Sequence, residues 1–451
     1  MLKSPFFFPS IRADSRLSDS MSYLPRSIKN HRSTHEAKTT HDLGLLLLSI
    51  FFQLFLGLFF GHLYDMRIFM ATGYLVATGQ NPYIALDLST LFNNPAFQGI
   101  TSIGYPPPWA LLLGFIYRVV YATTHNFLLY NLAIKVPIIA ANICLAYLVA
   151  RILNKIGIES ASSHKAWIFI LFNPILFYFA SAWGQIDSLV ALFSLLALTF
   201  LNDGKLIGSA ILLSLAISFK PIAFPILPVA LIFLWVRSHR QAISYFGMSL
   251  LCLFLFSVAP FYIFGWDPSP ILLNWNAHFI IVGGMSLLTF FELLFDSYKL
   301  PGWWWLLGML WIPALGIGIY LLKSGIHGYI DLLKKSLGLI LIFFLTRAWL
   351  SEPNIILILP LVLILCSAGE LDPRILTAIL VVPLIFTLFN GSLPQLLFPS
   401  LPILMNKILM LPSGYRTLGL IARSIMAIPW QIVGWKTVVA CYKGRDQSSK
   451  K

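Results

Sequence analysis

Long apolar runs alternate with short polar turns from residue 43 nearly to the end of the chain. The first run, 43–63, holds about 20 residues, enough for an α-helix to cross a hydrocarbon core of about 30 Å. A further apolar stretch, 109–124, is expected to dip in from the outer side, because counting it as a full crossing would reverse every later loop. The pattern predicts an all-α polytopic membrane protein with about 12 membrane-spanning helices, or 13 if 109–124 also spans. The predicted spans are 43–63, 126–150, 166–181, 187–202, 206–219, 221–236, 241–263, 303–322, 336–350, 354–368, 375–390 and 416–440.

Composition excludes a water-soluble protein. Of the 451 residues, 58% are hydrophobic and 11% are charged, whereas an ordinary soluble domain is about 25% charged. The net charge is +14, but no domain-sized stripe of Lys and Arg is present, so we expect no nucleic-acid partner. The four cysteines show neither metal-ligand spacing nor a disulfide framework: Cys144, Cys252, Cys366 and Cys441.

The basic residues predict the orientation of the chain in the membrane. They recur at alternate turns and in a tail, 1–42, that is too long for a cleaved signal peptide. By the positive-inside rule these turns face the cytoplasm, together with the C-terminal end at Lys443, Arg445, Lys450 and Lys451. The remaining turns are then outside, including a long first outer loop, 64–108. We expect the body of the protein over 43–368 and additional membrane helices over 369–451.

The turn Ser218–Phe219–Lys220–Pro221 breaks two short apolar segments and carries a cation. Such breaks are tolerated at membrane depth only where protein or a water-filled cavity surrounds them. The turn therefore predicts a cavity open to the outer side.

Asp65 is the candidate catalytic residue. It follows the first span directly, in a loop that also holds Gly79–Gln–Asn–Pro–Tyr83 and Gly104–Tyr–Pro–Pro–Pro–Trp109. A carboxylate at a membrane exit can be a simple topological marker. It also meets the condition for a base that deprotonates an acceptor hydroxyl, because it lies at the edge of a cavity open to both substrates.

Polar residues interrupt two apolar runs at Ala182–Trp–Gly–Gln–Ile–Asp–Ser188. Ionisable groups within membrane segments are costly and mark functional sites. Gln185 and Asp187 could hydrogen-bond a sugar, and Trp183 offers it a flat apolar face. The alternative is that Asp187 or Ser188 simply caps the next helix.

Three cations could contact a phosphate, each with a structural alternative. Lys220 needs an anionic partner, which is either a lipid phosphate or Asp187. Arg347 raises the same question, with Glu352 as its structural partner. His278 near Gly283–Gly284 is either a phosphate donor or an interfacial residue.

In this order and spacing, the motifs resemble the GT-C glycosyltransferase superfamily, from about residue 43 to 368. They are Asp65 with Gly79–Gln–Asn–Pro–Tyr83, Tyr105–Pro–Pro–Pro–Trp109, Asn173–Pro174, Trp183–Gly–Gln–Ile–Asp187, Ser218–Phe–Lys–Pro221 with Leu227–Pro228, and Ser351–Glu–Pro–Asn354 with Leu359–Pro360. Within the superfamily they look most like the polyprenyl-phosphate-mannose-dependent mannosyltransferases. These include the mycobacterial glycolipid enzymes and the catalytic subunit of GPI mannosyltransferase I.

The resemblance implies an inverting transferase that moves a hexose, by expectation mannose, from a polyprenyl-phosphate donor to a lipid or glycan acceptor. Its site would face the non-cytoplasmic side of the cell membrane or the endoplasmic reticulum. Asp65 matches the catalytic base and Lys220 a donor-phosphate contact, joined by Arg347 and His278. Expected sugar or acceptor contacts are Tyr64, Arg67, Tyr105, Trp183, Gln185, Asp187, Glu352 and Asn354, although Glu352 and Asn354 could instead cap a helix.

The sequence predicts no metal site and no cofactor, since the lipid-linked sugar is a substrate. The first loop lacks a second Asp two residues after Asp65, which argues against a metal-bridged mechanism, although a divalent ion stays open. A secondary transporter or lipid flippase is the competing reading, because a helix broken at Lys220–Pro221 also suits transport. A non-catalytic scaffold subunit is a third.

Overall fold

The computed structural model describes residues 28–92, 94, 97–295, 297–390, 392–401 and 413–443. The chain forms two units, Met1–Leu46 and Leu47–Lys451. Helix α1 (Ile28–Phe59) begins in the first and ends in the second. Most of the predicted basic tail, up to residue 27, lies outside the described residues, as do Arg445, Lys450 and Lys451.

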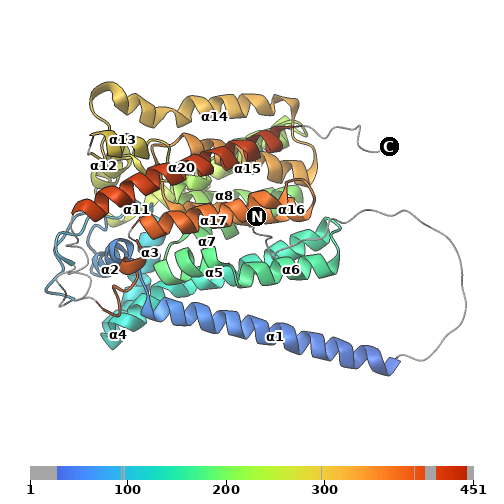
Figure 1. The fold of residues 1–451 in the computed structure, drawn as a ribbon, viewed down its shortest axis with the longest axis horizontal. Helices are drawn as coiled ribbons and strands as arrows, with labels where there is room; N and C mark the ends of the chain where they lie inside the picture. Colours follow the sequence, from blue (N-terminus) through green and yellow to red (C-terminus); the bar gives the residue numbers. More distant parts are fainter. Residues whose placement is uncertain are drawn as a thin grey trace, which may run out of the picture. The chain divides into compact units, whose positions relative to one another are not determined.

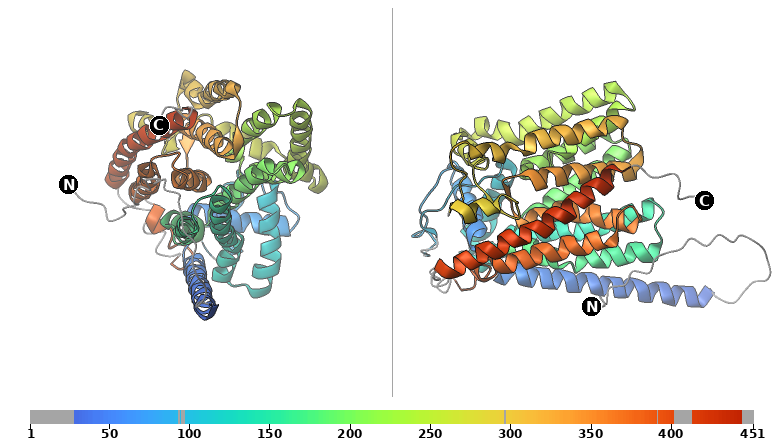
Figure 2. Two further views of the ribbon diagram at one scale, coloured as in Figure 1. Left: turned by 90° about the vertical axis from the view of Figure 1, so that its right-hand side faces the viewer. Right: turned by 45° about the horizontal axis from the view of Figure 1, so that its top comes forward.

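The second unit is built from helices that run alongside one another, as both sets of views show (Figures 1 and 2). Most of its helices coincide with the predicted apolar runs, because an uninterrupted apolar segment satisfies its backbone hydrogen bonds within a helix. They are α5 (Phe127–Lys155), α6 (Ser160–Leu171), α7 (Asp187–Asn202), α8 (Leu206–Phe219), α9 (Ile226–Trp235), α10 (His239–Leu253), α11 (Ala259–Phe264), α14 (Trp311–Tyr320), α15 (Gly328–Thr346), α16 (Ile355–Ser367), α17 (Pro373–Phe389) and α20 (Ser413–Tyr442).

Further elements connect these helices or extend them. The α-helical ones are α2 (Leu63–Ala77), α3 (Pro107–Ile116), α4 (Ala122–Thr124), α12 (Ser269–Ala277), α13 (Thr289–Phe295) and α18 (Ser392–Gln395). The π- and 3-10-helical ones are η2 (Tyr117–Tyr121), η3 (Leu176–Trp183), η4 (Pro221–Ala223), η5 (Phe254–Val258), η6 (Gly302–Met309), η7 (Leu321–Ser324) and η8 (Glu352–Asn354). A two-residue parallel pair, β1 (Gly283–Gly284) with β2 (Trp349–Leu350), departs from a purely helical fold.

Six helical stretches are long and apolar enough to cross a membrane, counted over the described residues. They are His41–Phe59, Phe127–Lys155, Ser160–Trp183, His239–Phe264, Gly302–Lys323 and Thr417–Tyr442. Five further apolar helices are shorter, at 10–17 residues. The protein is therefore mostly helical and membrane-like, while the count of 12 or 13 crossings stays a prediction.

The first outer loop differs from its expected form, because its beginning is helical. Helix α2 occupies Leu63–Ala77 and buries Met66, Phe69 and Met70, which lie three or four residues apart on one helix face. It packs against α3, where Trp109 meets the edge of Phe69 with ring centroids 5.5 Å apart. This packing makes the start of the segment a rigid platform for Asp65.

The turns predicted to face outward meet at one end of the second unit. The indole N–H of Trp275 donates to the carbonyl of Gly104 in the first outer loop at 2.9 Å, and β1 joins β2. Gly284 adopts φ +60°, and a Cβ there would clash with the Leu350 carbonyl, so this pairing requires glycine. At turns predicted to be cytoplasmic, Lys155 forms an ion pair with Asp203. Turns with the same predicted side therefore contact one another.

Candidate functional site

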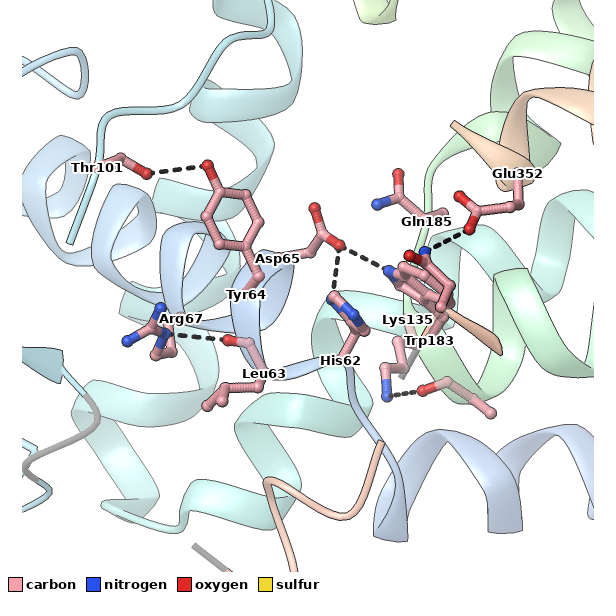
Figure 3. A network of polar contacts seen from close by, with 12 residues as sticks. His62, Leu63, Tyr64, Asp65, Arg67, Thr101, Lys135, Trp183, Gln185 and Glu352 are labelled. Carbon is pink, nitrogen blue, oxygen red and sulfur yellow. Dashed lines mark hydrogen bonds and ion pairs between the residues drawn. The ribbon is translucent and has the colours of Figure 1, made fainter. Parts of the chain in front are cut away.

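Asp65 lies in the first turn of α2 and faces the segment that follows η3 (Figure 3). Trp183 donates its indole N–H to the Asp65 Oδ2 at 2.6 Å. The His62 Nδ1 lies 3.0 Å from the same oxygen. The other oxygen, Oδ1, has no hydrogen-bond partner among the described residues. The carboxylate is thus fixed through one oxygen, and the second stays available to a substrate hydroxyl.

His62 and Trp183 form a stacked pair beneath this carboxylate. Their ring centroids lie 3.9 Å apart with an interplanar angle of 14°, and the His62 amide donates to the Trp183 carbonyl at 3.1 Å. Both residues are buried. The stack fixes the direction from which the two nitrogens approach Asp65.

Burial raises the pKa of the Asp65 carboxyl, but the contacts with His62 and Trp183, aided by the charge of Lys220, outweigh it and hold the pKa below its usual value. Donors to a carboxylate favour its ionised form. Asp65 is therefore ionised at neutral pH, as a base must be before it takes a proton.

Lys220 forms the buried ion pair that the sequence offered as its structural alternative. Its Nζ lies 3.0 Å and 2.8 Å from the two carboxylate oxygens of Asp187, and 5.5 Å from the ring centroid of Tyr105. The Tyr105 hydroxyl donates to the Gln185 Oε1 at 3.2 Å. Asp187 is the first residue of α7, and the residue before it, Ile186, occupies the N-cap position.

Arg347 does not pair with Glu352, its suggested structural partner. Its guanidinium lies over the ring of Phe343, 4.9 Å from the centroid, and no carboxylate of the described residues lies within ion-pair distance. Burial, and secondarily the charge of Arg347, lower the pKa of His278 to about 4. His278 is therefore neutral at pH 7, and Arg347 is the cation of this pair.

Glu352 is held by the C-terminal helices. The Asn390 amide donates to the Glu352 Oε1 at 2.5 Å, and Arg423 on α20 donates to the Asn390 Oδ1 at 2.8 Å. The Arg423 Nη2 also lies 3.8 Å from Glu292. Residues beyond the region of motif resemblance thus fix the carboxyl group of Glu352. Glu352 belongs to η8, which packs against η3.

The capping alternative is wrong for Asn354. It occupies the N-cap position of α16, but its side chain makes no capping hydrogen bond. The Asn354 Oδ1 is buried and has no hydrogen-bond partner in the part of the chain that the structure describes. An unpaired buried acceptor is costly. A ligand hydroxyl that donated to this oxygen would remove that cost.

Burial raises the pKa of the Glu352 carboxyl from 4.5 to about 7, so the folded protein holds this proton more tightly than the unfolded chain does. Stability should then fall as pH rises from about 4.5 to about 7. We expect Glu352→Gln, which keeps the acceptor for Asn390, to stabilise the protein by about 3 kcal/mol at pH 8 and little at pH 4.5, since one pKa unit is about 1.4 kcal/mol. Thermal unfolding in detergent at both pH values checks this, and an equal gain at both would contradict it.

Two other expected contacts lie at the edge of this cluster. The Tyr64 side chain is exposed, and its hydroxyl is 3.2 Å from the Thr101 hydroxyl. The Arg67 Nε donates to the Leu63 carbonyl at 3.1 Å. Figure 3 shows both side chains on the opposite side of Asp65 from Trp183.

Sequence reasoning missed His62, Lys135, Asn390 and Arg423. His62 precedes Asp65 by three residues, so helical spacing could have identified it. Lys135 is a cation within an apolar run, which is itself a functional signal. Asn390 and Arg423 gave no sequence signal, because their role depends on contacts across the fold. No group of His, Cys, Asp and Glu that could hold a metal occurs among the described residues.

No curated protein matches the chain. Residues 64–237, which carry Asp65, Tyr105, Trp183 and Lys220, match the MptA_B family, described as alpha-(1->6)-mannopyranosyltransferase, N-terminal domain. Over this segment the chain is similar to a mannosyltransferase family, which confirms the predicted resemblance to the mycobacterial-type mannosyltransferases.

Proposed function

We propose that the protein is an inverting mannosyltransferase that takes mannose from a polyprenyl-phosphate donor and passes it to a lipid or glycan acceptor on the non-cytoplasmic face. The observation that carries the proposal is the ionised Asp65, held through Oδ2 alone, within the segment that matches a mannosyltransferase domain. The apolar helices around it suit a donor whose tail stays in the bilayer.

In this mechanism Asp65 Oδ1 accepts the proton of an acceptor hydroxyl as its oxygen attacks the anomeric carbon. The bond from that carbon to the phosphate oxygen breaks, and the electron pair leaves with the polyprenyl phosphate. A base positioned in this way contributes about 10²–10⁴-fold to the rate. The sugar hydroxyls would be bound by Gln185 and by the unpartnered Asn354 Oδ1.

We assign the leaving phosphate to Arg347 rather than to Lys220. Lys220 is neutralised by both oxygens of Asp187, so the pair offers an anion little net attraction. Arg347 pairs with no carboxylate of the described residues, and a guanidinium presents a planar fork that suits phosphate. His278, neutral at pH 7, would donate a hydrogen bond beside it.

The proposed reaction is tested with purified protein in lipid vesicles that contain labelled polyprenyl-phosphate-mannose and a lipid extract as acceptor. We expect a new glycolipid with a mass increase of one hexose and release of polyprenyl phosphate. Movement of intact donor across the vesicle membrane without transfer would contradict the proposal and favour a flippase. Parallel reactions with polyprenyl-phosphate-glucose test the choice of sugar.

Replacing Arg347 tests the phosphate assignment. We expect Arg347→Gln to raise the donor KM by about tenfold or more, because a charge-assisted hydrogen bond to the phosphate contributes about 1.5–3 kcal/mol. Arg374→Gln, at a turn predicted to be cytoplasmic, should leave the donor KM unchanged. If Arg347→Gln binds the donor as tightly as the wild type, Arg347 does not contact the phosphate.

A further inference from the structure

Lys135 on α5 is a fully buried lysine whose partners are all backbone carbonyls. Its Nζ donates to the Gly57 carbonyl at 3.3 Å, to the Ala182 carbonyl at 3.0 Å and to the Phe60 carbonyl. Figure 3 shows it directly beneath Trp183 and His62. None of these partners carries a charge, so an ion pair does not explain this lysine.

The number and origin of these carbonyls explain why a lysine suits the position. An ammonium has three N–H donors, and three carbonyls surround it. Gly57 and Phe60 lie at the C-terminal end of α1, and Ala182 lies in the last turn of η3. The C-terminal end of a helix carries a partial negative charge. Two helix ends therefore converge on one amino group, which donates to carbonyls of both.

Asn131, one helical turn before Lys135, reinforces only one side of this arrangement. Its amide donates to the carbonyls of Gly57, Leu58 and Phe60 at 2.7, 3.0 and 2.9 Å. Asn131 therefore binds the end of α1 but not η3. Lys135 joins the two at their ends, in addition to the hydrogen bond that the Ser181 hydroxyl on η3 donates to the Gln53 Oε1 on α1 at 3.0 Å.

This joint lies directly beside the two residues that fix Asp65. His62 follows Phe60 by two residues, and Trp183 follows Ala182 by one. We propose that Lys135 is a positioning residue for the transferase site, which holds the ends of α1 and η3 together so that His62 stacks on Trp183 and both nitrogens reach Asp65 Oδ2. The kinetic part of this inference rests on the proposed function, whereas the structural part does not.

The test compares Lys135→Met, which keeps the side-chain length but has no donors, with the wild type. Diethyl pyrocarbonate, which modifies accessible imidazoles, is applied to the folded protein, and each histidine is read by peptide mass spectrometry. We expect His62 to react at least fivefold faster in Lys135→Met, relative to the exposed His125 of the same molecule. We also expect kcat to fall about 10²-fold with a donor KM changed less than threefold, because small misplacements of catalytic groups cost about that much.

Lys334→Met is the matched control, since it removes another buried lysine, whose Nζ lies 3.1 Å from Glu370. Glu370 follows the C-terminal end of α16, whereas Glu352 precedes its N-terminal end. It should change stability but neither His62 reactivity nor the kcat of the folded fraction. Lys135→Gln, which keeps two donors, is made in parallel in case Lys135→Met does not fold, and His62 should react faster in it too. Unchanged His62 reactivity in a folded Lys135 variant would overturn the inference. A wild type without transferase activity would refute the proposed function, while the labelling result would still decide the role of Lys135 in fixing His62.

Discussion

The Asp65→Asn variant should lose about 10²–10⁴-fold in kcat while its donor KM stays within about threefold of the wild type. The amide preserves the shape of the side chain, and its oxygen can still accept from Trp183. It cannot accept a proton from the acceptor hydroxyl, so only the chemical step suffers. Single-turnover transfer and direct measurement of donor binding separate the two effects.

Asp87→Asn is the control for this experiment, because Asp87 belongs to the same predicted outer segment and is exposed. Its carboxylate accepts from the amide and hydroxyl of Ser89. We expect wild-type kcat in this variant. If Asp65→Asn also turned over at the wild-type rate, Asp65 would be the topological marker that the sequence left open.

Loss of Lys220 should produce the largest change in stability. In Lys220→Met the carboxylate of Asp187, which is 0% exposed, loses the cation that pairs with it, and breaking a buried pair in this way costs about 3–5 kcal/mol. Thermal or denaturant unfolding in detergent measures the loss. Lys155→Met, which breaks the more exposed pair with Asp203, should cost less than about 1 kcal/mol.

The double variant Lys220→Met with Asp187→Asn separates the structural role of Lys220 from a phosphate contact. Removing both charges should restore most of the stability, since no unpaired charge stays buried. We expect its donor KM to lie within about threefold of the wild type, because the intact pair is electrically neutral. A tenfold rise in KM at restored stability would return the phosphate contact to Lys220.

The helices themselves were predictable, and the reason is local. A run of about 15–25 apolar residues must satisfy its backbone hydrogen bonds internally, so 126–150 and 241–263 could only be helical. The helical start of the first outer loop was not predicted, because the apolar face of α2 can be recognised only when its packing partner, α3, is known. The apolar pattern is short, comprising Met66, Phe69 and Met70, and it indicates a helix only when the surface that covers these residues is known.

Asp65, Trp183, Gln185 and Lys220 were identifiable as candidates because polar residues are conspicuous in a chain that is only 11% charged. Their partners were not. The bond between Trp183 and Asp65 joins residues 118 positions apart, and no local pattern encodes such a pairing. The choice for Lys220 between Asp187 and a lipid phosphate likewise depended on where two helices pack.

The sequence by itself determined the class of protein, the positions of its helices and the residues worth testing, because hydrophobic runs and isolated charges act over a few turns of chain. Only the tertiary structure decided which groups share a site. It showed that Asp65 is fixed through one oxygen by His62 and Trp183, that Lys135 joins the two helix ends beneath them, and that Glu352 is held by helices from the C-terminal end of the chain. These relations arise from packing between distant segments, and packing is a property of the whole fold.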